Sequence, residues 1–326
     1  MINFINVASP QSGIWYVGKR YYEYMSKFTT TQWHDLKWDR YTYDMFRNLV
    51  FPETIMEGIT MLVDDRLTPI NSDNQIMIMH DFFKDEYLPN YIKKEINIRL
   101  MKKYNTKVIT VSNYTAELSK QRGLNVIGTL YPFYSTEYKE FEKQNEVISV
   151  GSADKRKRND IITDFINKLP VEYKATRIGS PLAVNIGQRY LYADKIKEST
   201  LKWLYSFSKY LIFPSEDEGL GLPMIEALFH NVVVIANEKN PILKEFNYPE
   251  IIVPEKEGDF YIPDYPDISE FGKFRQDYMQ KIASQHTKIA KYLDLPDDIS
   301  EFEISQMTDA FRNSFDKWLE HKEDKS

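Results

Sequence analysis

The sequence predicts an α/β protein built from two doubly wound domains, and two observations lead to this prediction. Short apolar runs, typical of strands buried on both faces, alternate with helical stretches in both halves of the chain. The 326 residues, 42% of them apolar, suffice for two domains of ordinary size, each with its own core. Ligands of such folds bind at the carboxyl ends of the strands, so we expect functional residues just after strands.

The first half contains three apolar runs that predict strands, at residues 2–8, 75–80 and 107–111. A stripe of apolar residues at four-residue spacing predicts a helix between the last two runs: Ile92, Ile96, Leu100 and Tyr104. Ser112 or Asn113 can cap another helix, which runs to about Arg122. These elements form an N-terminal Rossmann-like domain, residues 1–140.

The second half repeats the alternation. Strands are predicted at residues 147–151, 173–179, 210–214, 232–236 and 250–253, with helices at 159–169 and 222–230. They form a C-terminal Rossmann-like domain, residues 146–300, and the charged stretch 136–144 marks the boundary. Ser300 and Glu303 form a capping-box pattern, which predicts a final helix in residues 301–326.

Composition excludes several classes of protein. A net charge of −6 argues against a nucleic-acid binder, which is usually basic. The absence of cysteine excludes disulfides, thiolate metal sites and a cysteine nucleophile. No run approaches the roughly 18 apolar residues of a membrane span, and the first residues lack a basic region and an apolar stretch. We therefore expect a soluble, cytoplasmic protein.

One segment combines a strand end, a glycine loop and a helix start. Residues 214–228 read PSEDEGLGLPMIEAL. Gly219 and Gly221 allow backbone N–H groups to approach a ligand closely, and Pro223 suits a first helical turn, whose positive end favours a phosphate. Glu218 and Glu226 lie before and after this loop, where their carboxylates can accept hydrogen bonds from sugar hydroxyls.

This segment resembles the Glu-x7-Glu signature of retaining GT-B glycosyltransferases, particularly family 4. Further resemblances are VVVIA at 232–236, PILKE at 241–245, His80-Asp81, ITVSNY at 109–114, and VGS at 150–152 followed by KRKRN at 155–159. They span residues 76–245. The resemblance implies the GT-B architecture, in which two Rossmann-like domains face a central cleft. It also implies that the final helix packs back towards the N-terminal domain.

The resemblance also implies roles for individual residues of the second domain. Glu226 would bind the ribose of a nucleotide and Glu218 the hydroxyls of a donor sugar, whereas the alternative is that both are solvated surface acids. The backbone of the loop would hold the rest of the donor, at Gly219, Leu220, Gly221 and Leu222. Lys157 and Arg158 both fit the cation that neutralises the diphosphate. Ser152, also at the donor site, stands where the family often has a basic residue, so a second phosphate-binding cation is unidentified.

In the first domain, His80 ends an apolar strand, where the resemblance implies contact with the donor sugar or the acceptor. A structural role is its alternative, and Asp81 can instead cap a helix. Gly13 and Gly18 stand where the family carries a glycine-rich loop near the phosphates, with the bulky Trp15 and Tyr16 between them. Asn231 replaces a family glycine and tolerates the left-handed conformation that a helix end needs.

The function implied is transfer of a sugar, with retained configuration, from a nucleotide diphosphate sugar to a saccharide, lipid or protein. We expect no essential metal and no other cofactor, since Asp64-Asp65 is not a DxD motif. A catalytically inactive GT-B module, acting as a partner or regulatory subunit, is the alternative. A phosphorylase or an epimerase shares the architecture, whereas no GxGxxG supports a dehydrogenase. The basic helix at 91–104 fits contact with an anionic membrane or, preferentially, an ordinary surface position.

Overall fold

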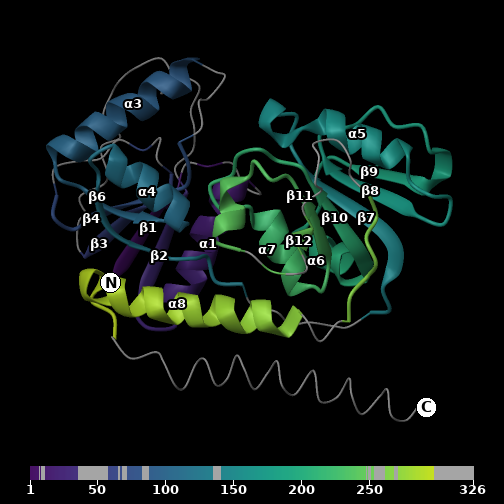
Figure 1. Cartoon of the computed structure of the whole chain (residues 1–326). Coiled ribbons are helices and arrows are strands. Elements are labelled where there is room, and N and C mark those ends of the chain that lie inside the picture. Colours follow the sequence, from purple (N-terminus) through teal and green to yellow (C-terminus); the bar gives the residue numbers. More distant parts are fainter. Residues whose placement is uncertain are drawn as a thin grey trace, which may run out of the picture. The chain divides into compact units, whose positions relative to one another are not determined.

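The computed structural model describes residues 1–6, 8, 12–35, 58–64, 67, 72–82, 88–134, 141–246, 248, 251–252, 261–267 and 271–296 (Figure 1). The side chains of 88–93 and 252 are not included. The chain divides into two compact units. Unit 1 contains the described residues of Met1–Tyr134 and Met279–Ala310, and unit 2 those of Ser135–Tyr278.

Unit 1 is built on a six-stranded parallel sheet in the order β2-β1-β3-β4-β5-β6. Its central strands are apolar and buried, as the continuous apolar runs predict. The strands are β1 (Ile2–Asn6), β2 (Thr31–Asp35), β3 (Ile59–Leu62), β4 (Gln75–Met79), β5 (Lys107–Thr110) and β6 (Asn125–Thr129).

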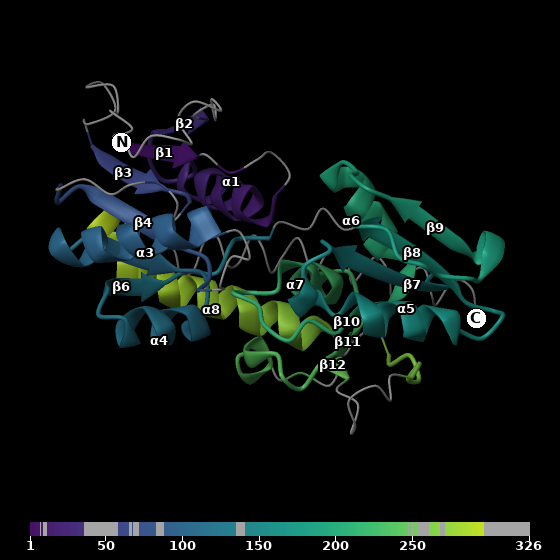
Figure 2. The ribbon, with the colours of Figure 1, turned by 90° about the horizontal axis from the view of Figure 1, so that it is seen from above.

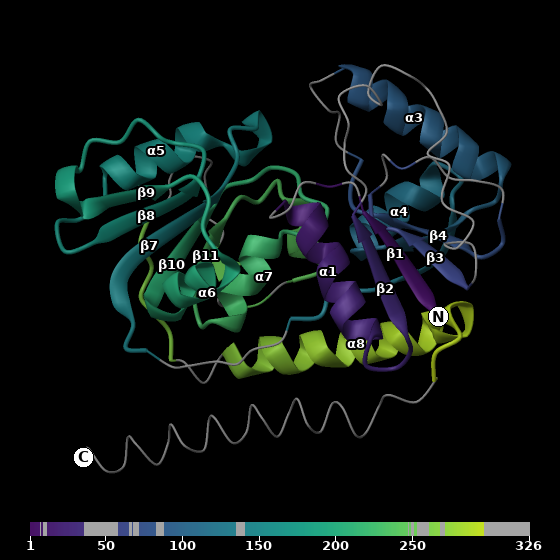
Figure 3. The same cartoon turned by 180° about the vertical axis from the view of Figure 1, so that it is seen from behind.

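Three helices of unit 1 follow the first, fourth and fifth strands. Helix α1 (Gly13–Met25) runs beside β1 and β2 (Figure 3). Helix α3 is Leu88–Lys103, and α4 (Asn113–Gln121) lies next to β6 (Figure 2). Ser112 caps α4, because its side chain accepts a 3.0 Å hydrogen bond from the Thr115 N–H. Of the two cap candidates, the structure therefore selects Ser112.

Unit 2 is built on a second six-stranded parallel sheet, in the order β12-β11-β10-β7-β8-β9 (Figure 1). The chain builds β7, β8 and β9 outward in one direction, and then returns to the other side of β7 for β10, β11 and β12. This is the Rossmann order, and its switch point lies between β7 and β10. The strands are β7 (Gln144–Gly151), β8 (Lys174–Gly179), β9 (Tyr190–Ala193), β10 (Ser208–Phe213), β11 (Val233–Ala236) and β12 (Ile251–Ile252).

Three of the described helices of unit 2 connect these parallel strands, and the fourth, α8, follows the last strand. They are α5 (Asn159–Asn167), α6 (Glu198–Phe207), α7 (Leu222–Phe229) and the first part of α8 (Phe271–Leu293). Helix α7 contacts β10 and β11, as seen from above in Figure 2. The two doubly wound α/β domains predicted from the sequence are confirmed.

Several elements differ from the sequence prediction. The apolar pattern did not reveal four strands, β2, β3, β6 and β9. It also did not reveal three helices, α1, α6 and α8. Helix α8 continues from unit 2 into unit 1, so residues 279–296 lie in unit 1, whereas the sequence prediction placed them in the second domain. The predicted final helix with its Ser300–Glu303 cap lies outside the described residues, as do 136–140 of the predicted boundary and Asp65 beside Asp64.

The prediction of a glycine-rich loop after β1 is wrong in one respect. Gly13 begins helix α1, and Gly18 lies inside this helix. Ser12 caps this helix by accepting a 3.2 Å hydrogen bond from the Trp15 N–H. A Cβ at Gly18 would come within 2.3 Å of a Val63 methyl carbon, which identifies Gly18 as a packing glycine. The close contact with Val63 needs a small residue at this turn of the helix, and Gly18 provides it.

Candidate functional site

The loops after β7 and β10 meet at the switch point of unit 2. Adjacent parallel strands end at the same edge of the sheet, so their loops become neighbours although some 60 residues of chain separate them. The Arg156 carbonyl accepts hydrogen bonds from the Glu216 N–H at 2.9 Å and from the Ser215 hydroxyl at 3.3 Å. These backbone contacts fix the β7 loop and the β10 loop against each other.

The Glu218 carboxylate occupies the centre of this contact and is only 6% exposed. One oxygen accepts a hydrogen bond from the Lys157 ammonium. The other accepts one from Arg156 Nη1 at 3.3 Å, and the same nitrogen donates to the Asp217 carbonyl at 2.8 Å. A buried carboxylate needs such partners, since burial of an unpaired charge is costly. The structure thus brings together two predicted site residues, Glu218 and Lys157, and adds Arg156.

Arg158 takes a different course from Lys157. Its backbone adopts the left-handed conformation, with φ of 50°, at the turn into helix α5. Its guanidinium donates to Glu216 Oε1 at 2.6 Å and to Asp160 Oδ2 at 2.9 Å. The hydrogen bond from Arg158 lowers the pKa of the exposed Asp160 carboxyl. Of the two cations that the sequence left open, Lys157 is therefore the one at Glu218.

Arg177 on β8 is a buried cation behind the end of β7. Its guanidinium donates to four neutral oxygens within 3.0 Å, namely Ser149 Oγ, Gly151 O, Asn159 Oδ1 and Ser180 O. Burial lowers the pKa of this guanidinium to about 10, so it stays charged at neutral pH. Arg177 therefore ties β8 and the start of α5 to the strand end from which the Lys157 loop departs.

Helix α7 starts directly after the glycine loop. Gly221 precedes it in the left-handed conformation, with φ of 75° and ψ of 50°, which a side chain tolerates poorly. Pro223 lies in the first turn, as predicted. Glu226, on the second turn, is 8% exposed, so neither it nor Glu218 is a surface acid. A helix start with two buried carboxylates around a glycine loop is a polar site, because buried carboxylates need polar partners.

The other end of α7 is held by polar contacts. Asn231 has a φ of 55°, the left-handed conformation expected of it. Arg275 donates to the Asn231 side chain and, at 3.2 Å, to the Phe229 carbonyl. The bond to Phe229 satisfies a carbonyl group that a helix end otherwise leaves unpaired. The position of Glu226 is thus fixed from both ends of its helix.

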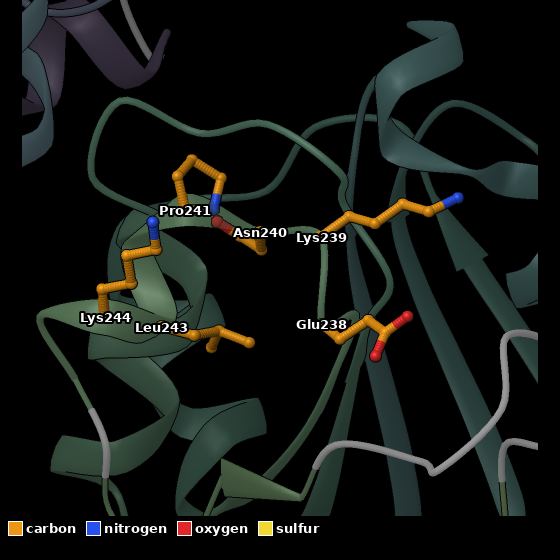
Figure 4. Close-up of a pocket in the computed structure, with 6 residues that line it drawn as sticks. All are labelled: Glu238, Lys239, Asn240, Pro241, Leu243 and Lys244. Carbon is orange, nitrogen blue, oxygen red and sulfur yellow. The ribbon is translucent and has the colours of Figure 1, made fainter.

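Two surface cavities border these loops. One, of about 640 Å³, is lined by the loop after β7, the start of α5 and one residue of the β10 loop. Its lining residues are Ala153, Asp154, Lys155, Arg156, Arg158, Asn159, Asp160 and Glu216. The other, of about 670 Å³, lies after β11. Figure 4 shows Pro241, Leu243 and Lys244 on one of its sides and Glu238 and Lys239 on the other.

Glu216 links the surroundings of the two cavities. Its Oε1 accepts from Arg158 and lies 3.7 Å from the Lys239 ammonium. The carboxyl ends of β7, β10 and β11 thus carry two groups of paired charges, one around Glu218 and one around Glu216. Sequence reasoning missed three members, namely Arg156, Glu216 and Lys239. Position in the basic run or near the glycine loop was the available signal for Arg156 and Glu216, but only contacts distinguish all three from solvated charges.

In unit 1, His80 lies at the end of β4, 6% exposed. Its Nε2 lies 2.6 Å from the Val63 carbonyl, so Nε2 carries the proton and donates. Asp81 accepts a 2.8 Å hydrogen bond from Lys94 of α3. The Asp81 carboxylate thus holds a neighbouring helix by an ion pair. His80 and Gly13 follow strands β4 and β1 of unit 1, and Ser152, whose carbonyl accepts from Asn159 at 2.9 Å, follows β7 of unit 2.

Comparison with known proteins adds to this geometry. No family model matches the chain. The O-antigen chain mannosyltransferase RfbU of Salmonella typhimurium is 27% identical over 188 residues, which cover 51% of this chain and 52% of that protein. The chain therefore spans about half the length of this curated relative in the match.

Solved structures resemble the chain over nearly its whole length. HepE of Anabaena, crystallised with UDP-glucose, covers 97% of this chain and 99% of its own at a TM-score of 0.56 and 11% identity. WaaG, a glycosyltransferase involved in lipopolysaccharide biosynthesis, covers 95% of this chain and 98% of its own, at a TM-score of 0.54 and 12% identity. The trehalose-6-phosphate synthase OtsA covers 96% of this chain and 98% of its own, at a TM-score of 0.54 and 11% identity. The fold is therefore the two-domain α/β architecture of the GT-B type.

Proposed function

We propose that the chain is a glycosyltransferase that takes a sugar from a nucleotide diphosphate sugar. The observation that carries the proposal is the buried Glu218–Lys157 pair beside the glycine loop and Glu226, at the switch point where such folds bind nucleotides. HepE, of the same fold, was crystallised with UDP-glucose, and RfbU is named a mannosyltransferase. In the proposal, Glu226 binds the ribose, Glu218 the donor sugar, and the loop backbone from Gly219 to Leu222 the diphosphate.

The chemistry follows from the charges around the diphosphate. The bond between the sugar's anomeric carbon and the phosphate oxygen breaks, and its electron pair stays on the diphosphate. The acceptor hydroxyl oxygen forms the new bond to the anomeric carbon and passes its proton to the leaving phosphate. Lys157 stabilises the growing negative charge, which is where an enzyme gains most from fixed cations. We propose retention of configuration, because in this path the acceptor attacks the anomeric carbon from the same face that the diphosphate leaves, and no protein nucleophile is needed.

Binding of nucleoside diphosphates tests the donor site. Calorimetry with UDP, GDP, ADP and TDP should find one that binds the wild type, and Glu226→Ala should weaken that binding by about tenfold or more, the loss expected for hydrogen bonds to a charged group. Glu198→Ala, an exposed acid on α6, is the matched control and should bind normally. Binding of none of the four by the folded wild type would refute the proposal and favour an inactive module.

The role of Lys157 leads us to propose that no metal is needed. Transfer activity should persist in excess EDTA, because protein cations supply the charge that a divalent ion supplies elsewhere. Loss of activity in EDTA, restored by Mg²⁺ or Mn²⁺, would overturn this part.

The acceptor is proposed only as a class, namely a saccharide, a lipid or a protein hydroxyl. Among the described helices, none is long and apolar enough to cross a membrane. Membrane contact through residues 91–104 is the weaker proposal, because Lys94 is engaged by Asp81 and its side chain is only 12% exposed. Sedimentation with anionic and neutral vesicles tests this contact, and the absence of binding to either kind of vesicle would exclude it.

A further inference from the structure

We infer that Glu218 and the diphosphate of the donor compete for the same two cations, so that the ion pairs seen here are exchanged when the donor binds. This inference rests on the proposed function and adds a mechanism to it. It also assigns Arg156 as the second phosphate-binding cation, which the sequence left unidentified at Ser152.

The first support is that both cations are already committed. Lys157 pairs with one oxygen of Glu218, and Arg156 Nη1 lies 3.3 Å from the other. Arg156 Nε also donates to Asp154 Oδ2 at 2.8 Å. An incoming diphosphate thus meets cations whose charge is balanced by carboxylates. It must draw them away from Glu218 or bind beside a like charge, which is unfavourable.

The second support is where the two cations lie. The Lys157 side chain is 14% exposed and that of Arg156 is 25% exposed, whereas the Glu218 side chain is 8% exposed. The two cations are therefore more accessible to an incoming ligand than the carboxylate, which lies deeper. Arg156 also lines the cavity of about 640 Å³ after β7. A guanidinium at this position can bind a phosphate with two parallel hydrogen bonds.

The third support is the cost of leaving Glu218 without partners. When the two cations turn to a diphosphate, the buried carboxylate needs other donors, and the hydroxyls of an attached sugar provide them. A nucleotide sugar replaces all the lost bonds, whereas a nucleoside diphosphate alone leaves Glu218 unsatisfied. Exchange therefore favours the intact donor over the diphosphate product, and it helps the product to leave because Glu218 recovers its cations.

Removal of the competing carboxylate tests the exchange. Glu218→Gln should bind the nucleoside diphosphate found for the wild type about tenfold more tightly, a change within the usual range of coupling between paired charges. The same variant should lose most of the preference for the nucleotide sugar over the diphosphate. Asp164→Asn is the matched control, because it removes a carboxylate paired with Lys168 on the surface of α5, and it should leave both affinities unchanged.

A double-mutant cycle separates exchange from simple repulsion. In an Arg156→Gln background, binding should be weaker, and Glu218→Gln should improve it by a clearly smaller factor, about threefold, because one contested cation is gone. An equal factor in both backgrounds would overturn the exchange, and so would unchanged or weaker binding by Glu218→Gln. Glu218→Ser serves if the glutamine variant does not fold. If the folded wild type binds none of UDP, GDP, ADP and TDP, the proposed function itself fails.

Discussion

Single residues at the switch point of unit 2 have roles that neighbouring residues of the same type do not share. Lys157 and Arg158 are consecutive cations, yet Lys157 contacts the buried Glu218 and Arg158 contacts Glu216 and Asp160. The difference arises from the backbone, because the left-handed turn at Arg158 sends consecutive side chains in different directions. A basic run therefore contains both a candidate ligand-binding cation and a loop-fixing one.

This difference predicts unequal effects of two similar substitutions. Lys157→Gln should weaken binding of the nucleoside diphosphate by about tenfold or more, because it removes a charged partner of the phosphate. Arg158→Gln should change that affinity much less and should mainly loosen the loop. Calorimetry on both variants measures this, and a larger loss for Arg158→Gln would reverse our assignment.

Gly221 is the other residue whose conformation decides its identity. Gly221→Ala should destabilise the protein by about 1 kcal/mol, because alanine is strained at a φ of 75°. Gly13→Ala is the matched control, since that glycine begins a helix and a Cβ there meets nothing within 4 Å. Urea unfolding of both variants compares them. Equal stability of Gly221→Ala and the wild type would show that the loop relaxes without cost.

At the scale of elements, the sequence predicted strands more reliably than the helices around them. The strands β4, β5, β10 and β11 are buried apolar runs that pairing on both sides demands, so their pattern is unmistakable. Helix α1 was missed, because two glycines and two aromatic residues in its first turns have low helix propensity. Packing against β1 and β2 stabilises it, and a single sequence does not reveal that contact.

The packing of α1 against unit 1 gives an element-scale prediction. Gly18→Ala should destabilise the protein by roughly 1–3 kcal/mol, since the new methyl would overlap Val63. On an open helix face, the same change would be stabilising, because alanine favours helices. The double variant Gly18→Ala with Val63→Ala should recover part of the loss in thermal unfolding. No recovery would mean that the methyl clashes elsewhere.

At the scale of the whole molecule, stability depends on a titratable group that is buried without its charge. His230 follows α7 and is 3% exposed. Burial, together with the positive charges of Lys143, Lys202 and Arg275, lowers the pKa of His230 to about 3, so this histidine is uncharged in the folded protein at neutral pH. Lys143 donates to three backbone carbonyls here, of Tyr205, Ser208 and His230, so the cation is fixed in place.

This histidine predicts how stability changes with pH. The unfolded chain binds a proton at His230 near pH 6.5 and the folded chain does not, so the free energy of unfolding should fall as the pH drops below 6.5. The contribution is at most about 1.4 kcal/mol per pH unit and continues towards pH 3. Urea unfolding between pH 5.5 and 7 measures this dependence. The free energy of unfolding should change less with pH in His230→Phe, which keeps a flat ring beside Tyr205, than in the wild type. An unchanged slope would place the titration elsewhere.

By itself the sequence determined the two doubly wound α/β domains, most strands of unit 2 and the segment that contains Glu218 and Glu226. These features follow from local patterns, namely buried apolar runs, glycines where a chain turns, and a proline at a helix start. Only the tertiary structure decided that Lys157 rather than Arg158 lies at Glu218, that Arg156 joins them, and that Gly18 packs inside a helix. Those facts depend on which strands become neighbours, and the return of the chain from β9 to β10 brings together loops that lie far apart in sequence.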